Sequence, residues 1–386
     1  MGFTRRFNDW LLLQTHWRCA EPVLVLESDD WGLERTPCAE LLSRYGEATD
    51  WALESTESAE DLEELFAVLL KHRDQFGRPA CMTANFVVSN PDYSAIERSG
   101  FSEYHNVPID VSCPPDVMAK YREGIEEKCF YPQYHGLRHF HPLALLRDLR
   151  SDFPGARELF YHGSATGLGM IRGMLWRYHS EYQECGASQF DSLDAIQSTC
   201  EAGLAIFERC FGFRSQSTIP PHYLVSDDLF PAFCNAGFRY IQGGNYQVRY
   251  TSGRTEVQQA GLGMAAPAGL RFLARNVKLE PRPTRSETVE QAIEAAGFLC
   301  EARIPVVVDT HRINYTGQFR RQALEALDQF LSGMASKKPT YMTSAELGAA
   351  VENAGLFGDF SGAQQRTLGP IAGTRTAAAR LAISQL

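Results

Sequence analysis

The sequence lacks the features that mark disulfide-rich, membrane-spanning or nucleic-acid-binding chains. Its ten cysteines form no CxxC pair and are too dispersed along 386 residues for a disulfide scaffold. No run approaches the ~18 to 20 uninterrupted apolar residues of a membrane span. No long stretch of lysine and arginine offsets the formal charge of -10. We therefore expect reduced thiols, no membrane span and no nucleic-acid partner, and composition leaves the oligomeric state open.

Strand and helix patterns alternate along the chain, which favours parallel β/α units. With 44% hydrophobic content, the length allows one large α/β barrel or two ordinary domains. Strands are predicted at residues 22–27, 80–87, 158–162, 216–220, 238–242, 270–274 and 304–310. Helices are predicted at residues 58–72, 143–151, 191–211, 226–236, 286–302 and 318–336.

The stretch VLVLESDDWG runs four aliphatic residues into paired acids, Asp29 and Asp30. A continuous apolar run of this kind predicts a strand buried on both faces, and the carboxyl ends of such strands collect functional groups. Neighbouring residues of an extended segment point in opposite directions, so one acid can bind a cation while the other handles a proton. The alternative is that Asp30 caps the segment that follows it.

The stretch YHGLRHFHP contains three histidines. His135 and His139 are four residues apart, and on a helical turn both imidazoles reach one metal ion. Together with Asp30 they make two histidines and a carboxylate, a common catalytic-metal set. His141 is the rival ligand, because His139 and His141 share a side if the segment is extended. Structural histidines are the alternative.

The stretch PVVVDTHR repeats the pattern of a buried strand that delivers polar groups to the same rim. His311 is suited to general acid chemistry near neutral pH. Asp309, two residues earlier, is placed either to orient His311 or to cap the strand end.

These three stretches, in this order, resemble the polysaccharide deacetylase family, also called the NodB-homology domain or carbohydrate esterase family 4. Segments 193–241 and 338–347 also look like parts of that family. The resemblance covers about residues 22–350 and implies an α/β fold, a distorted (β/α) barrel. We expect insertions in it near 89–132 and 163–190, a helical extension over 1–21 and a peripheral tail over 351–386.

The family resemblance also implies the chemistry. Asp29 aligns with the catalytic base, and His311 aligns with the catalytic acid. Asp30, His135 and His139 align with the ligands of a divalent metal, zinc first, with cobalt, nickel or manganese also compatible. The expected reaction is removal of an acetyl group, N-acetyl before O-acetyl, from an acetylated carbohydrate. Since Asn8, Asp9 and other polar residues interrupt any secretory core in the first 19 residues, we expect a cytoplasmic enzyme that acts on a glycan precursor.

Four residues are candidates for contact with the substrate. A backbone N–H between Pro221 and Tyr223 is placed to stabilise an oxyanion, and Asn85 and Arg275 occupy rim positions. Asn276 is a further rim candidate, with turn formation as its alternative. Aromatic candidates for stacking on a sugar, or for packing within loops, are Tyr93, Tyr131, Tyr134, Trp176, Tyr178, Tyr223, Tyr246 and Tyr315.

The chain departs from the family pattern at Ile219, where the family has an arginine that orients the base. Arg138, Arg214 and Arg275 are candidates to replace it. The departure leaves two other functions open. One is a non-catalytic sugar-binding relative that retains the metal, and the other is a glycosidase that uses Asp29 and Asp309.

Overall fold

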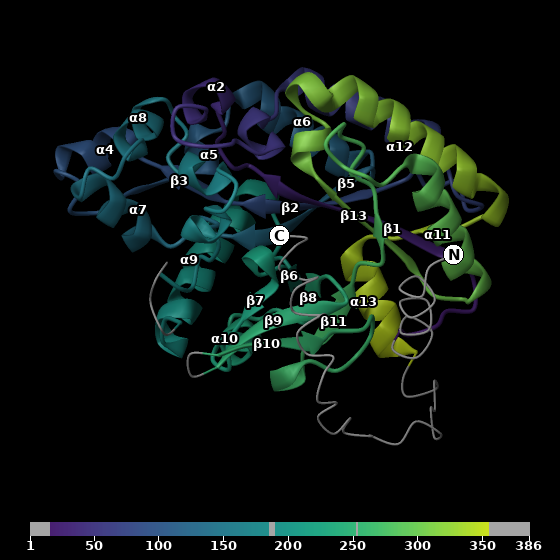
Figure 1. Ribbon diagram of the computed structural model, residues 1–386. Helices are drawn as coiled ribbons and strands as arrows, with labels where there is room; N and C mark the ends of the chain where they lie inside the picture. The colour runs from purple at the N-terminus through teal and green to yellow at the C-terminus, as the bar shows by residue number, and fades with distance from the viewer. Residues whose placement is uncertain (1–15, 185–189, 252–253, 355–386) are drawn as a thin grey trace, which may run out of the picture.

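A parallel sheet forms the centre of the protein in the computed structural model, which describes residues 16–184, 190–251 and 254–354 (Figure 1). Residues 1–15 of the predicted extension and 355–386 of the predicted tail lie outside the described residues. The strand order is β11-β8-β6-β5-β2-β1-β13-β12, and β14 pairs with β1. The strands are β1 (Val23–Trp31), β2 (Met82–Val87), β5 (Phe130–Gly136), β6 (Ser217–Thr218), β8 (Tyr240–Gly243), β11 (Arg271–Ala274), β12 (Val277–Lys278), β13 (Val306–His311) and β14 (Thr340–Tyr341).

The two ends of this strand order meet in the chain. β11 and β12 lie at opposite ends of the order, yet only Arg275 and Asn276 separate them. The Arg275 N–H donates to the carbonyl of Gly243 on β8, and the Asn276 N–H donates to that of Val307 on β13. The sheet therefore curls round on itself, which confirms the expected distorted (β/α) barrel.

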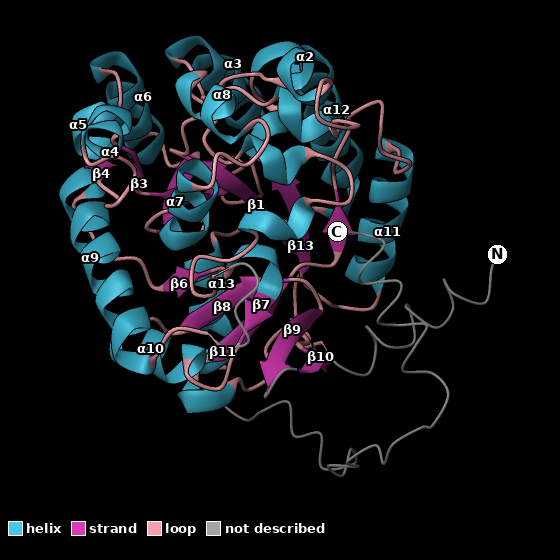
Figure 2. Ribbon diagram, turned by 60° about the vertical axis from the view of Figure 1, so that its left-hand side comes forward, coloured by secondary structure: helices cyan, strands magenta, loops and turns pink. Residues whose placement is uncertain are grey.

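Helices surround the strands on the outside, as Figure 2 shows. The longest are α3 (Ala59–Lys71), α6 (Pro115–Glu126), α7 (Pro142–Arg150), α9 (Leu193–Phe211), α11 (Val289–Glu301), α12 (Arg320–Met334) and α13 (Ser344–Asn353). Shorter ones are α2 (Ala39–Leu42), α4 (Tyr93–Arg98), α5 (Ile109–Ser112), α8 (Ala156–Tyr161) and α10 (Leu229–Asn235). Capping boxes begin α3, α11 and α13, where Ser58, Thr288 and Thr343 each exchange hydrogen bonds with the third residue of the helix. In the described part of the chain, no helix has the length and apolarity to cross a membrane.

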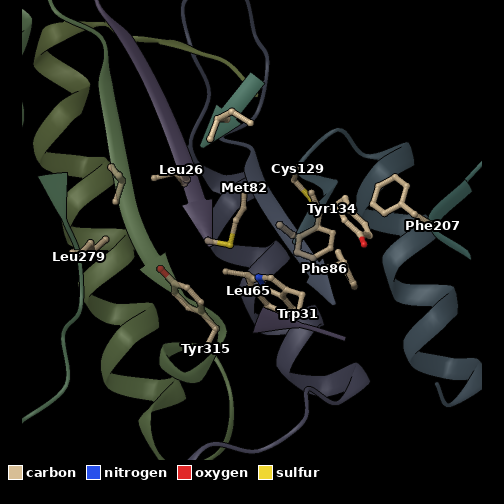
Figure 3. Close-up of a cluster of buried hydrophobic side chains, with 14 of the residues drawn as sticks. Leu26, Trp31, Leu65, Met82, Phe86, Cys129, Tyr134, Phe207, Leu279 and Tyr315 are labelled. Carbon is tan, nitrogen blue, oxygen red and sulfur yellow. The ribbon is translucent and has the colours of Figure 1, made fainter. Parts of the chain in front are cut away.

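The buried strands β1 and β13 pair in parallel, with Leu24 opposite Val306 and Asp29 opposite His311. All nine residues of β1 are buried. Leu24 and Leu26 on one face of β1 pack in the large core cluster, which Figure 3 shows for Leu26, Met82 and their neighbours. Val23 and Val25 on the other face belong to a second buried cluster. This register brings two predicted functional residues side by side at one rim.

Two small sheets lie outside the barrel. β3 (Ser89–Pro91) and β4 (Asn106–Pro108) pair antiparallel within the predicted insertion at 89–132. β9 (Tyr246–Thr251) pairs antiparallel with β10 (Arg254–Gln259) and parallel with β7 (Leu224–Val225).

The predicted strand at 158–162 is wrong, because these residues fall in α8 and the turn after it. Ala156, Leu159 and Phe160 are the buried residues of α8, and their spacing of three and four places them on one helical face. A short apolar run does not distinguish a buried strand from a buried helical turn. Conversely, β5 begins at Phe130 inside the predicted insertion, so a barrel strand was missed there.

Candidate active site

The rim end of β1 contains a β-bulge that turns both acids toward one cavity. The pairing of β1 with β2 shifts register between Ser28 and Trp31, and Asp30 has a φ of +73°. A regular strand would send Asp29 and Asp30 to opposite faces. Aspartate tolerates the left-handed conformation better than most residues do, and here both carboxylates line a cavity of about 780 Å³. The bulge explains why paired acids end a buried strand, and Asp30 caps no helix, since α2 starts only at Ala39.

Asp30, His135 and His139 form a group suited to a metal ion, with one ligand atom of each within 4.8 Å of the others. Asp30 Oδ1 lies 3.5 Å from His135 Nε2 and 3.4 Å from His139 Nε2. Among the described residues, this buried oxygen has no hydrogen-bond partner. The Nδ1–H of His135 is placed to donate to the carbonyl of Ile219 at 2.9 Å, which leaves the Nε2 lone pair facing Asp30. The donor set therefore fits a divalent metal.

The charges of Asp30 and His139 suit a cation. Burial by itself would raise the pKa of Asp30, but its interactions with His135 and His139 hold that pKa well below the usual range. Burial holds the pKa of His139 well below its usual value, which keeps its imidazole neutral. An ionised carboxylate beside a neutral imidazole is the protonation state that a metal site requires. Burial by itself would lower the pKa of His135, but the hydrogen bond with Asp30 and the charge of Asp29 raise that pKa, so a metal would take the place of a proton there.

The two histidines come together on a strand end and a loop, so the predicted helical turn is wrong. His135 lies near the end of β5, and His139 lies beyond it with a φ of +70°. Glu181 holds this loop, because its two carboxylate oxygens accept the N–H groups of Leu137 at 3.1 Å and Arg138 at 2.8 Å. His141 is not in the metal group, and its Nε2 lies 3.3 Å from Asp191 Oδ1.

Arg275 binds Asp29 and so makes the contact that was expected from an arginine at position 219, where this chain has Ile219. Arg275 Nη1 and Nη2 donate to Asp29 Oδ2 at 2.7 Å and to Oδ1 at 2.6 Å. Arg275 also donates to Glu27 at 2.7 Å and to Asp309 at 2.8 Å, so three carboxylates surround one buried guanidinium. Burial by itself would raise the pKa of Asp29, but Arg275 outweighs it and lowers that pKa to about 2. The other two candidates bind elsewhere: Arg138 lies beside Glu181, and Arg214 donates to Ala236.

His311 is oriented by Glu280 rather than by Asp309. His311 Nδ1 lies 2.6 Å from Glu280 Oε1, and its Nε2 faces Asp29 Oδ2 at 3.8 Å. Burial by itself would lower the pKa of His311, but the charge and hydrogen bond of Glu280 raise that pKa to about 9. The ring of Trp51 packs edge-on against the imidazole of His311, with 5.1 Å between the ring centroids. His311 is therefore protonated near neutral pH, with Nε2–H directed into the cavity next to Asp29.

Of the residues predicted to contact the substrate, some line the cavity and others do not. Asn85 and Pro221 do not line the cavity. Asn85 is fully buried and donates from Nδ2 to Asp29 Oδ1 and to Gln242 Oε1, both at 2.7 Å. Arg275 lines the cavity, but its guanidinium is committed to the three carboxylates. Among the aromatic candidates, Tyr178, Tyr223 and Tyr246 line the cavity.

The turn after β6 supplies a single backbone donor. Proline has no N–H, and that of Tyr223 donates to the carbonyl of Pro220 at 2.9 Å. His222 therefore supplies the one remaining N–H between Pro221 and Tyr223. His222 has a φ of +53° and Tyr223 one of +57°, and two adjacent non-glycine residues in this conformation store strain of the kind found at functional sites.

Sequence reasoning missed Glu280, Glu181, Trp51 and His222, which complete the site. A signal existed for Glu280, because in the segment VKLE after the strand at 270–274 Lys278 and Glu280 alternate with the apolar Val277 and Leu279. Nothing local marks Glu181 or Trp51, because their roles depend on contacts with distant segments.

No protein-family model matches the chain, and no curated protein matches it. Among solved structures, it is similar to a putative polysaccharide deacetylase from Mycobacterium smegmatis, with 12% identity, a TM-score of 0.42 and coverage of 87% of this chain and 92% of that one. It is also similar to the Xyl-CE4 domain of a multidomain xylanase from the hindgut metagenome of Trinervitermes trinervoides, with 10% identity, a TM-score of 0.39 and coverage of 86% and 91%. A third is a CE4 family pseudoenzyme from Bacillus anthracis, with 8% identity, a TM-score of 0.36 and coverage of 85% and 66%. At these identities and TM-scores, the likeness carries no conclusion about this chain.

Proposed function

We propose that the protein is a metal-dependent hydrolase that removes an acetyl group, N-acetyl before O-acetyl, from a sugar or glycan precursor. One observation carries the proposal. The metal group of Asp30, His135 and His139 shares a cavity with an ionised carboxylate, Asp29, and a protonated imidazole, His311. Hydrolysis of an amide needs this combination of a proton acceptor, a proton donor and an electrophile.

The residues that would hold the metal are Asp30, His135 and His139, with zinc first among the candidates. When bound, a divalent metal polarises a carbonyl and lowers the pKa of a water. Asp29 is the proton acceptor of this reaction. Burial by itself would raise its pKa, but Arg275 keeps the carboxylate ionised, so it is able to accept a proton near neutral pH. Arg275 and Asn85 fix the orientation of its carboxylate.

His311 is the proton donor to the leaving group. Glu280 takes its Nδ1–H, so the proton on Nε2 is the one that points toward the cavity. As the C–N bond breaks, this proton passes to the departing amine, and acetate and a free amino sugar result. The backbone N–H of His222 is the candidate donor to the oxyanion, in place of the broader range from Pro221 to Tyr223.

The two alternative functions have less support. A non-catalytic sugar binder was suggested by the missing arginine at position 219, and Arg275 supplies the contact that this arginine was expected to make. A glycosidase needs two carboxylates on opposite sides of the scissile bond. Asp29 and Asp309 instead accept hydrogen bonds from the same Arg275 Nη1 atom, so they lie on one side.

Acetate release tests the proposal. The purified protein is incubated with a panel of N- and O-acetylated sugars, with and without chelator and added zinc, and its metal content is measured. We expect acetate that depends on the metal. In Asp29→Asn we expect the metal to remain while the rate falls by a factor of about 10² to 10⁴, whereas Asp30→Asn loses the metal. Reducing ends released by chelated protein would favour the glycosidase, and sugar binding without acetate would favour the binder.

A further inference from the structure

The cavity wall beyond His311 carries charges that acetyl hydrolysis itself does not use. In the segment from β12 onward, Lys278, Glu280 and Arg282 line the cavity, whereas Leu279 is buried in the core and Val277 is buried at the edge of the cavity. This is the two-residue period of an extended chain. Lys278 is exposed and lies opposite Asp309 in the parallel pairing of β12 with β13, so its side chain shares the face of the site.

Two arginines extend this wall. Arg282 has a fully buried side chain that donates to Glu280 Oε2 at 2.6 Å and stacks over the Trp51 ring at 4.6 Å. The N–H of Arg285 donates to the carbonyl of Arg282 at 2.9 Å, and Arg285 also lines the cavity. A third of the Arg285 side chain is exposed there, while its Nε lies 3.7 Å from Asp50 Oδ2.

Lys278 and Arg285 are the positive groups at this end of the cavity that remain exposed or partly exposed, whereas Arg282 is buried. Glu280 and Asp50 are the two carboxylates that pair with these arginines, since Asp50 Oδ2 also lies 3.5 Å from Arg282 Nε. They face four positive groups, which are Lys278, Arg282, Arg285 and the protonated His311. No carboxylate within the described ranges forms an ion pair with Lys278. Two further acids line this part of the cavity, Glu294 of α11 and Asp309, and Asp309 accepts a hydrogen bond from Arg275.

The geometry points to an anion-binding subsite made by Lys278 and Arg285, so that the preferred substrate is an acetylated sugar that carries a phosphate or a carboxylate. The inference rests on the proposed function, because it takes His311 as the donor to the leaving amine. The sugar ring is attached to that amine, so the ring lies on the His311 side of the cavity, next to Glu280 and the two arginines. Of the positive side chains, Lys278 is exposed and Arg285 is partly exposed, so these two contact the anion. Arg282 is buried next to Glu280 and does not contact it.

The test compares four substrates that share one acetamido sugar. They are N-acetylglucosamine, its 1-phosphate, its 6-phosphate and N-acetylglucosaminuronic acid. We expect the wild-type protein to prefer at least one anionic substrate by about tenfold or more in kcat/KM, the effect of one charge-assisted contact. Which anion is preferred distinguishes phosphate from carboxylate recognition.

Variants then assign the preference to the subsite. Lys278→Gln and Arg285→Gln should each reduce the anionic-to-neutral ratio about tenfold, and Glu294→Gln should increase it. Arg172→Gln is the matched control, because Arg172 is exposed, pairs with Glu47 and does not line the cavity. Equal kcat/KM for neutral and anionic sugars, or a ratio that these variants leave unchanged, overturns the subsite while the deacetylase stands.

A binding measurement separates the two ideas if no acetate appears. Calorimetric titration of the metal-loaded protein with the two sugar phosphates does not depend on turnover. Weaker binding in Lys278→Gln and Arg285→Gln supports the subsite even though the proposed reaction fails. Binding that is the same in these variants and in the wild-type protein overturns the subsite.

Discussion

Arg275 donates hydrogen bonds to both carboxylate oxygens of Asp29, although 246 positions separate the two residues in the chain. The contact spans the point where the barrel closes, since Arg275 sits between the two end strands and Asp29 sits on β1. A planar guanidinium with two parallel donors fixes the rotation of the carboxylate as well as its charge. Arg275 is therefore a positioning residue for the proposed base.

Replacing Arg275 with lysine tests this role. Arg275→Lys keeps the charge but loses the two-pronged contact, so we expect kcat to fall about tenfold to a hundredfold, with a stability loss of roughly 1–3 kcal/mol from the weakened buried ion pairs. Steady-state kinetics and urea unfolding measure the two effects. Arg214→Lys is the control, because Arg214 binds a backbone carbonyl outside the cavity. An unchanged kcat in Arg275→Lys would contradict the role.

The Glu280–His311 pair predicts the basic limb of the pH profile. The pKa of His311 is raised to about 9, so the imidazole keeps its acidic proton below that pH and loses it above. In Glu280→Gln the largest cause of the increase is removed, while burial lowers the pKa of His311 and Asp29 and Asp309 still raise it, so this pKa should fall toward its usual value. The basic limb of kcat/KM should move down by more than about one pH unit.

The same pair makes stability depend on pH. Because the folded-state pKa is above the unfolded value, its stabilising contribution is complete below pH 6.5 and is lost as the pH rises toward 9. NMR titration of His311 in the metal-free protein and thermal unfolding at several pH values measure both effects. Glu287→Gln, an exposed substitution nearby, should change neither. If His311 titrates at the same pH in Glu280→Gln as in the wild-type protein, Glu280 does not raise its pKa.

Glu181 should control metal affinity without touching the metal. Both of its oxygens accept backbone N–H groups of the loop that carries His139, and glutamine offers only one acceptor oxygen. We expect Glu181→Gln to weaken metal binding about tenfold to a hundredfold by loosening His139. Competition with a chelator of known affinity measures this. Glu184→Gln, at an acid that pairs with Arg147, should bind metal normally.

Gly203 of α9 should be essential for packing. A Cβ at this position would clash with the hydroxyl oxygen of Tyr134, a fully buried side chain on β5. We expect Gly203→Ala to destabilise the protein by about 1–3 kcal/mol, because overpacking outweighs the gain in helix propensity. Gly297→Ala in α11 is the control, since its Cβ would meet only Lys337 Cε at 3.8 Å, and it should stabilise by up to about 1 kcal/mol. Urea unfolding of both variants provides the comparison.

The local pattern of the sequence determined much of the fold. Apolar runs identified β1 and β13 as buried strands that deliver acids and a histidine to one rim, and both strands are as expected. Helical patterns placed α3, α7, α9, α11 and α12 close to their bounds. These features are readable because side-chain periodicity depends on residues a few positions apart. The grouping of Asp30, His135 and His139 was also predicted, although on the wrong local geometry.

Only the tertiary structure decided which residues contact and orient the functional side chains of the site. The bulge at Asp30, the closure of the barrel through Arg275, the loop held by Glu181 and the orientation of His311 by Glu280 all depend on which segments meet across the sheet. Hydrophobic pattern does not specify such partners, because a buried carboxylate accepts a hydrogen bond from whichever donor the closed barrel brings within reach. The chain's sequence thus determined which chemical groups reach the rim, and closure of the barrel decided which of them bind, orient and charge one another.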